Sequence, residues 1–425
     1  MLSRILAKRW ELAALLSMCG IYLISYFQRS AIPGTIFNRL QTELQLSASD
    51  VTGLSAMFMY IYAGMQLFVG IAADRLGGRR VLMWGGLLML IGSVIFPLSH
   101  ELWALYLGRV LTSLGASCLF LSLLREVNIL FSPASFAIIL GFIGFSGSIG
   151  GVLAMSPFNW ASTIFGWRET LLWVAGATSL FLIAGLVILR RLPVEDFSHL
   201  KPFSFQPVID IVKRRSNLPL LVAGLINFSI MFMMQVTLGK KFLQDFANFS
   251  SAQASLCMLL MMVVCAVCNL SGGMIIRWMG NRRKPILITV PLMLSTATLM
   301  LIIGVIIHVP TIYFFISFLI LSTQTIGMPA INSTMKELNR PEHVAQSVAV
   351  INGLAYVGVA IITTIAGLIL DKFRSSATVT PTGIIYPSQA YLTLFILLFI
   401  LSMTSLIIST RIPETRGVQA EFAPE

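Results

Sequence analysis

Charged residues are scarce in this chain of 425 residues, where they make up 11% of the sequence against 57% for hydrophobic residues. An ordinary soluble domain carries about 25% charged residues. The shortage excludes one or two water-soluble globular domains, because these need a polar surface. It favours a membrane protein: at about 20 apolar residues per transmembrane helix, the hydrophobic residues would fill about twelve spans. We therefore expect an all-α integral membrane fold.

Cysteine and histidine are also few, and neither is arranged for chemistry. The cysteines all lie within apolar runs, which favours helix packing over a disulfide framework: Cys19, Cys118, Cys257, Cys265 and Cys268. The CxxC pair at 265–268 lacks the second pair that a metal site needs. The histidines lie in or beside loops, and no Ser-His-acid arrangement is visible. We expect no enzyme activity, no cofactor and no metal.

Basic residues are in excess, with a net charge of +12, but they form short clusters between apolar runs. A nucleic-acid-binding protein gathers its basic residues into a polar patch with exposed aromatic residues. The clusters here are typical of juxtamembrane segments that face the cytoplasm and anionic lipids. We therefore expect a lipid bilayer and no nucleic acid as partner.

Apolar stretches long enough to cross a membrane follow one another along the chain. Six precede a polar segment that runs from Arg190 to Asn217, and six follow it. The first is too long for a signal peptide and is expected to remain as an uncleaved helix. The predicted spans are 11–32, 50–73, 81–98, 103–124, 136–158, 169–189, 218–238, 252–276, 285–307, 311–331, 345–370 and 389–410.

Basic residues are unequally shared between the two sides of these spans. With the N-terminus inside, the outer segments carry only Arg39, Arg168, Lys240, Lys241, Lys372 and Arg374, and the inner segments carry the other clusters. The positive-inside rule then places both termini in the cytoplasm. We expect a multi-pass protein of the cytoplasmic (inner) membrane.

Two corresponding loops share a pattern. The segment 70–80, GIAADRLGGRR, lies between the second and third spans, and 273–283, GMIIRWMGNRR, between the eighth and ninth. An offset of 203 residues aligns two glycines and two arginines. The match indicates a tandem duplication, as in transporters whose substrate site lies between two repeats.

The first loop resembles the G-x-x-x-D-R-x-G-R-R signature of the major facilitator superfamily, and the resemblance covers the whole chain. A second family motif, R-x-x-Q-G-x-G, is matched in part at 109–115, where Thr112 and Ser113 replace the glutamine and the first glycine. The resemblance implies twelve transmembrane helices in two pseudo-symmetric six-helix bundles. We expect these bundles at 1–190 and 218–410, a cytoplasmic linker at 191–217 and a cytoplasmic tail at 411–425.

In that family, the acid and arginines of the loop form a cytoplasmic network that latches the two halves in the outward-facing state. Carried over, the resemblance predicts a conformational latch of Gly70, Asp74, Arg75, Gly77, Arg79, Arg80 and Glu126. It places Asp74 near the start of the eleventh span, Gly70 at a close approach of helices, and Arg79 or Arg80 against Glu126. The alternative is a plain solvated turn. Arg277 replaces the acid in the second copy, where we expect a weaker latch.

Two arginines lie within predicted spans, where an ionised side chain is costly and is therefore a functional candidate. Arg29 shares a helix face with Tyr22 and Tyr26, and Arg109 lies in the fourth span. No Asp or Glu occupies the middle of a predicted span, so the two charges favour an anionic ligand, such as a carboxylate or phosphate. The alternatives are snorkelling of Arg29 to the outer head groups and a structural hydrogen-bonding role for Arg109.

The segment 26–29 also resembles the first span of organic-anion transporters in the superfamily, where an Asp-Arg pair occupies this place. Gln28 replaces that acid here, which weakens a copied proton-coupling mechanism. Polar side chains of other spans complete the candidate substrate-binding set, although each also suits a hydrogen bond between helices: Tyr62, Gln66, Asn227, Gln235, Gln324, Asn352 and Tyr356.

These observations predict a secondary transporter that imports a small carboxylate-bearing solute, such as an organic acid, sugar acid or amino acid, by alternating access. We expect a monomer, with proton symport and facilitated diffusion both open. The alternative is an efflux antiporter of drugs or amphipathic compounds, suggested by the Met- and Phe-rich segment 231–234. The tail 413–417, PETRG, resembles that of sugar porters, which are a minor alternative. A receptor with a transporter fold is another.

Overall fold

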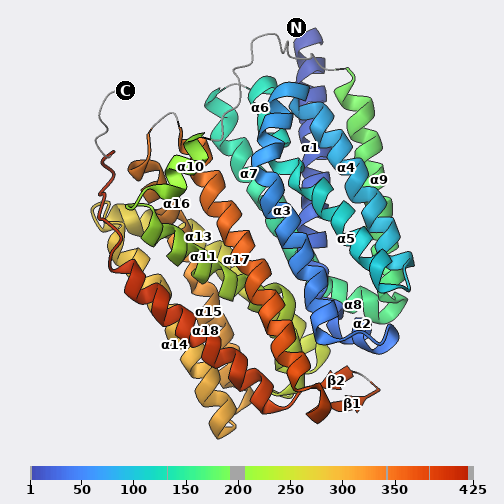
Figure 1. Cartoon of the computed structure of the whole chain (residues 1–425). Helices are drawn as coiled ribbons and strands as arrows, with labels where there is room; N and C mark the ends of the chain where they lie inside the picture. Colours follow the sequence, from blue (N-terminus) through green and yellow to red (C-terminus); the bar gives the residue numbers. More distant parts are fainter. Residues whose placement is uncertain (1, 132, 192–205, 341–342, 382, 420–425) are drawn as a thin grey trace. The chain divides into compact units, whose positions relative to one another are not determined.

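The computed structural model describes residues 2–131, 133–191, 206–340, 343–381 and 383–419, without the side chains of 2–8, 67, 71, 74, 133–138, 207 and 345. Helices account for nearly all of the described chain (Figure 1). The chain divides into two compact units. The first comprises Met1–Ile32 and Met57–Phe203, and the second comprises Pro33–Ala56 and Ser204–Glu425.

Long helices form the first unit, and two of them are interrupted. The helices α5 and α6 meet at Cys118, and the pair α7 and α8 is bent by 44°. The helices of this unit are α1 (Leu2–Ala31), most of α3 (Ala48–Leu76), α4 (Gly78–Leu98), α5 (Leu102–Ser117), α6 (Leu119–Leu130), α7 (Pro133–Leu153), α8 (Ser156–Phe165) and α9 (Trp167–Leu189).

The second unit begins with η1 (Gly34–Ile36), α2 (Phe37–Glu43) and the first turns of α3. In Figure 1, α10 lies at one end of this unit and the β1–β2 hairpin at the other. We name these the α10 end and the hairpin end. The remaining elements are α10 (Gln206–Lys213), α11 (Leu218–Met233), the π-helix η2 (Met234–Leu238), α12 (Gly239–Asp245), α13 (Ser251–Trp278), α14 (Lys284–Ile307), α15 (Thr311–Ser322), η3 (Thr323–Gly327), α16 (Met328–Leu338), α17 (Val344–Lys372), η5 (Arg374–Ser376), β1 (Thr378–Thr380), β2 (Gly383–Ile385) and α18 (Ser388–Ser409).

Every predicted span falls on helical chain. Ten helices of the described residues are long and apolar enough to cross a membrane, and the bent pair α7–α8 makes an eleventh. The remaining predicted span, 50–73, lies within the 29 residues of α3. The predicted all-α membrane fold is confirmed.

Three details differ from the sequence prediction. The seventh span was predicted to end at 238, but the helix continues through η2 and α12 to Asp245. Lys240 and Lys241 therefore lie within a candidate span and are buried, not placed in an outer loop. The segment Pro33–Ala56 groups with the second unit, and part of the predicted linker forms α10, while 192–205 lies outside the described residues.

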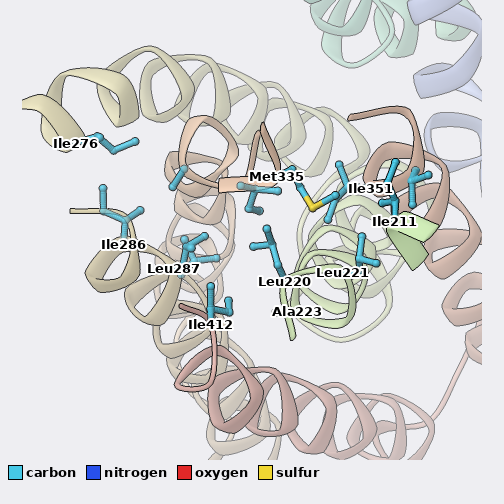
Figure 2. Close-up of a cluster of buried hydrophobic side chains, with 14 residues drawn as sticks. Ile211, Leu220, Leu221, Ala223, Ile276, Ile286, Leu287, Met335, Ile351 and Ile412 are labelled. Atoms are coloured by element: carbon cyan, nitrogen blue, oxygen red, sulfur yellow. The ribbon is translucent and has the colours of Figure 1, made fainter. Parts of the chain in front are cut away.

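A compact apolar core anchors α10 at its end of the second unit (Figure 2). Ile211 of α10 is buried together with Leu220 and Leu221 of α11, Met335 of α16 and Ile351 of α17. Removing apolar side chains of this size from water stabilises by about 1.5 to 3 kcal/mol each. The helix that follows the polar linker is therefore fixed to the second unit by its apolar face.

Small residues bring α4 and α5 together in the first unit. A Cβ added to Gly92 would lie 2.5 Å from the carbonyl oxygen of Gly108 and from the amide nitrogen of Thr112. A Cβ on Gly115 would meet the carbonyl oxygen of Gly85. Lipid tails are as apolar as the side chains, so helices in a bilayer associate through close contacts of this kind.

We expect Gly92→Ala to destabilise the protein by about 1 to 3 kcal/mol, because the added methyl group meets backbone atoms that cannot move away. Its melting temperature in detergent, followed by loss of the monodisperse peak in size-exclusion chromatography, measures the effect. Gly176→Ala in α9 is the matched control, because a Cβ there meets nothing within 4 Å among the described residues. Equal melting temperatures for the two variants would contradict the prediction.

Candidate functional site

Arg29 lies in the last turn of α1 and is buried in the first unit, with 4% of its surface exposed. Its guanidinium carbon lies 3.8 Å from the centre of the Tyr26 ring and 5.5 Å from the centre of the Tyr62 ring. Cations are attracted to aromatic faces at such distances and to the negative end of a helix. The structure thus holds the Arg29 guanidinium inside the protein, away from the surface that snorkelling would require.

Further aromatic rings surround this cation. Tyr22 lies edge-to-face with Tyr26, with ring centres 5.1 Å apart, and 5.6 Å from the ring centre of Phe120 on α6. Tyr62 of α3 stacks parallel to Phe58 at 6.2 Å. Three of the predicted residues, Tyr22, Tyr26 and Tyr62, are therefore grouped with Arg29 by contacts. Gln66 lies one turn after Tyr62 on α3 and is partly buried.

Glycines of α7 allow this arrangement. A Cβ on Gly147 would lie 3.1 Å from ring atoms of both Tyr22 and Tyr26, and a Cβ on Gly150 would meet the carbonyl oxygen of Leu23. The glycines at these two positions let α7 lie directly against the aromatic face of α1. A Cβ on Gly141 or Gly144, which lie earlier on α7, would meet nothing within 4 Å among the described residues.

Arg109 of α5 has a different environment. Its terminal nitrogens donate hydrogen bonds to the carbonyl oxygens of Gln28, at 3.0 Å, and Ile32, at 3.1 Å. Its guanidinium also lies 4.5 Å from the centre of the Phe58 ring. The last carbonyl groups of a helix lack partners within that helix. Arg109 supplies donors at the end of α1, which is the contact expected if its role is structural hydrogen bonding. Its role in substrate binding stays a prediction.

The charged turn between α3 and α4 contains one ion pair of the predicted latch. The backbone N–H of Arg79 donates to Glu126 Oε1 at 2.6 Å, and Arg79 Nε lies 3.7 Å from Glu126 Oε2. Gly77 has a φ of +89°, which favours glycine. A Cβ on Gly78 would lie 2.6 Å from the carbonyl oxygen of Ser122. The two glycines thus bring the start of α4 onto the buried carboxylate of Glu126.

The structure shows fewer close contacts for the other members of the predicted latch among the described residues of this unit. Arg75 and Arg80 are exposed. A Cβ on Gly70 would be in ordinary contact with Leu121 Cδ1, at 4.0 Å, among the described residues. The side chain of Asp74 lies outside those that the structure describes. The function of the group as a latch stays a prediction.

A family model described as Major Facilitator Superfamily matches residues 18–363, which is most of the chain. The chain belongs to the major facilitator superfamily. A solved structure with the same fold is the crystal structure of a POT family transporter in complex with 5-aminolevulinic acid, with a TM-score of 0.77 at 12% identity over 95% of this chain and 96% of that chain.

Curated relatives of this superfamily member match over shorter stretches. The "Probable sulfoacetate transporter SauU" of Cupriavidus necator is 26% identical over 38% of this chain and 37% of its own length. The hexuronate transporter of Bacillus subtilis is 24% identical over 39% and 37%, and the methyl viologen resistance protein SmvA of Salmonella typhimurium is 28% identical over 33% and 30%. The matches span less than half of each relative. The family match and the candidate spans together make the chain a multi-pass membrane protein of this superfamily.

In this superfamily member, Gln28 has a partner outside α1. Its amide donates to Ser93 Oγ of α4 at 3.1 Å, and its side chain is 2% exposed. The residue that replaces the acid of the organic-anion branch therefore joins two helices of the first unit.

The predicted polar residues of the second unit are dispersed. Asn227 accepts a hydrogen bond from Ser405 of α18 at 2.8 Å, which is a contact between helices. Gln235 lies in the π-helix η2 and donates to Cys265 Sγ at 3.6 Å. Tyr356 packs edge-on against the ring of Phe228, at 5.4 Å. Gln324 is buried in η3, and Asn352 is partly buried on α17.

The second copy of the charged turn carries a network that the sequence did not reveal. Arg283 pairs with Glu337 of α16 at 2.8 Å. The backbone N–H groups of Arg283 and Lys284 donate to the two carboxylate oxygens of Glu414, at 2.9 and 3.1 Å. Thr415 donates to Glu337. The PETRG segment thus supplies an acid from the tail to this turn, and the weaker latch expected from Arg277 stays a prediction.

A buried ion pair at the hairpin end was also not predicted from the sequence. Lys241 Nζ lies 2.6 Å from Asp245 Oδ1, and Tyr391 donates to Asp245 Oδ2 at 2.7 Å. Spacing of i and i+4 on a helix was the available signal. The prediction that the seventh span stops at 238 concealed it.

We expect Glu414→Gln to lower the melting temperature at about pH 7 by about 1 to 3 °C, because the variant loses the charge at the start of α14. Burial raises the pKa of Glu414, but the N–H groups of Arg283, Arg416 and Lys284 outweigh it and hold the pKa below its ordinary 4.5. The stabilisation is therefore present above about pH 4.5 and is lost as the pH falls.

Melting temperatures of the wild type and Glu414→Gln, measured from about pH 7 to about pH 4, test this sign. The difference between the two proteins should shrink toward the acidic end. Glu101→Gln, which changes an exposed acid of the first unit, should melt as the wild type does throughout. A difference for Glu414→Gln that is independent of pH would contradict the assignment.

Proposed function

We propose that this superfamily member is a secondary transporter of small, carboxylate-bearing organic solutes, which it imports by alternating access. The observation that carries the proposal is the buried Arg29 guanidinium held on the face of Tyr26 within a candidate span. A buried cation in a membrane span is costly, so its retention argues for a function.

The chemistry around Arg29 supports an anion with an apolar or stacking body. Guanidinium presents a planar fork of donors that matches a carboxylate, where a lysine would present a point charge. Tyr22, Tyr26 and Tyr62 lie around that fork and would contact the rest of the solute. A site of a few polar groups on an aromatic lining is typical of small-molecule recognition.

The named relatives support the same class of substrate. Sulfoacetate and hexuronate, which appear in the names of two relatives, are both organic anions. The excess of basic residues in one set of loops supports an orientation with both termini in the cytoplasm. In that orientation the pair Arg79–Glu126 would belong to the cytoplasmic latch.

Gln28 argues against a titrating acid beside Arg29, since its amide is engaged with Ser93. Proton coupling, where present, would have to use Glu126, Asp74 or the carboxyl group of the solute. Uptake measured with and without a proton gradient separates symport from facilitated diffusion.

We expect Arg29→Gln to lower uptake of the transported anion in proteoliposomes by roughly tenfold to a hundredfold, because a hydrogen bond to a charged group contributes about 1.5 to 3 kcal/mol. The assay uses labelled hexuronates, aldonates, sulfoacetate and amino acids. Uptake by Arg29→Lys should lie between that of the wild type and that of Arg29→Gln, because lysine keeps the positive charge but lacks the planar fork of donors.

Arg277→Gln is the matched control, since it removes the same charge from an exposed position at the end of α13. It should transport as the wild type does. The proposal fails when the wild type takes up no anion of the panel, or when a folded Arg29→Gln transports normally. Export of methyl viologen without anion uptake would favour the efflux alternative.

A further inference from the structure

The start of α3 is fastened to the end of α17 by one carboxylate. Asp371 Oδ1 accepts a hydrogen bond from the backbone N–H of Ala48 at 2.8 Å, and Oδ2 accepts one from the N–H of Ser49 at 2.9 Å. Ala48 is the first residue of α3, and Asp371 is the second-last residue of α17. Both lie in the second unit, although α3 continues into the first.

The contact satisfies two requirements of a helix start. The first N–H groups of a helix have no acceptor within the helix, and the helix dipole favours a negative charge there. The Asp371 carboxylate provides both the acceptor and the negative charge, although it lies more than 300 residues from Ala48 in the sequence. Asp50 caps the same start locally, by accepting from the N–H of Ser47 at 3.0 Å.

A glycine one turn earlier on α17 lets the two helices meet. A Cβ on Gly367 would collide with Thr52 Oγ1 and would lie 3.0 Å from Ser49 Cα. Any larger residue at 367 would therefore push the start of α3 away from α17. Gly367 and Asp371 act on the same two turns of α3.

The spacing of these two residues repeats the charged signature of the first unit. Near the end of α3, the chain reads Gly70-x-x-x-Asp74-Arg75, and near the end of α17 it reads Gly367-x-x-x-Asp371-Lys372. Both helices are 29 residues long. The same G-x-x-x-D-basic pattern thus stands near the ends of two helices, which are the second and the eleventh predicted spans.

Further side-chain contacts join the segment Pro33–Ala56 to other parts of the second unit. Lys240 Nζ donates to the carbonyl oxygen of Thr35 at 2.7 Å. The Gln41 amide donates to Tyr386 Oη at 3.0 Å. The hydroxyl groups of Ser55 and Thr237 lie 2.9 Å apart. The segment is therefore held along its length and not at one point.

We propose that Gly367 and Asp371, with Ala48, Ser49 and Thr52, form a latch at the hairpin end that holds the outer side of the transporter closed. The inference rests on the proposed alternating access, in which the outer ends of the two repeats must part. Because α3 belongs to one repeat and α17 to the other, opening breaks both hydrogen bonds of Asp371. The latch then sets how often the outer side opens without substrate.

The test measures access from outside in the absence of any transported solute. Ser55→Cys places a thiol at a fully buried position of the segment, and a membrane-impermeant maleimide is added to intact cells. We expect the Ser55→Cys protein to be labelled slowly. Adding Asp371→Asn should make labelling about five to ten times faster, because the amide replaces one hydrogen-bond acceptor of the carboxylate by a donor. The parent with its native cysteines gives the background.

Asp50→Asn is the matched control, because Asp50 caps α3 locally through Ser47. It should leave the labelling rate unchanged. Gly367→Ala is the second latch variant and should accelerate labelling in the same direction. Melting temperatures show which variants are folded.

The latch is refuted when Asp371→Asn and Gly367→Ala, each folded and combined with Ser55→Cys, both label at the rate of Ser55→Cys alone. It is also refuted when Asp50→Asn accelerates labelling as much as they do. Failure of the substrate proposal has a different signature, since labelling needs no solute. A protein that transports no anion and still shows the accelerated labelling would retain the latch and lose the assigned substrate.

Discussion

The placement of a carboxylate on the first N–H groups of a helix organises both repeats of this transporter. Glu126 accepts from the N–H of Arg79 at the start of α4. Glu414 accepts from those of Arg283 and Lys284 at the start of α14, and Asp371 from those of Ala48 and Ser49 at the start of α3. Asp50 caps the start of α3 as well, so several of the 17 acids in 425 residues lie at helix starts, where backbone donors would otherwise lack partners.

Buried cations follow the complementary rule. Arg109 donates to carbonyl oxygens at the end of α1, and Lys241 is paired with Asp245 at the hairpin end. Such partners offset the cost of removing a charge from water. The Arg29 guanidinium lies on the rings of Tyr26 and Tyr62, and the Arg109 guanidinium also lies on a ring, that of Phe58. Aromatic faces attract cations, so both buried arginines of the first unit are held partly by aromatic side chains.

Much of this architecture could be predicted from the sequence, because hydropathy and loop charge are local properties. The spans and the pair Arg79–Glu126 needed only neighbouring residues or a family signature. Lys241–Asp245 was missed because a double lysine ended the predicted span, although the helix continues through η2. Asp371, Glu337 and Glu414 were missed for another reason: their partners are decided by tertiary packing, and nothing in their own segments indicates it.

The two G-x-x-x-D patterns suggest why closing one side of such a transporter opens the other. Asp371 at the end of α17 holds the start of α3, and the signature acid Asp74 near the end of α3 is expected, by the family resemblance, near the start of α17. In the proposed alternating access, a rocking motion that separates one pair of helix ends would bring the other pair together. Each of the two proposed states would then keep one acid-to-helix contact and lose the other. A solute with modestly different affinity for them can shift the balance.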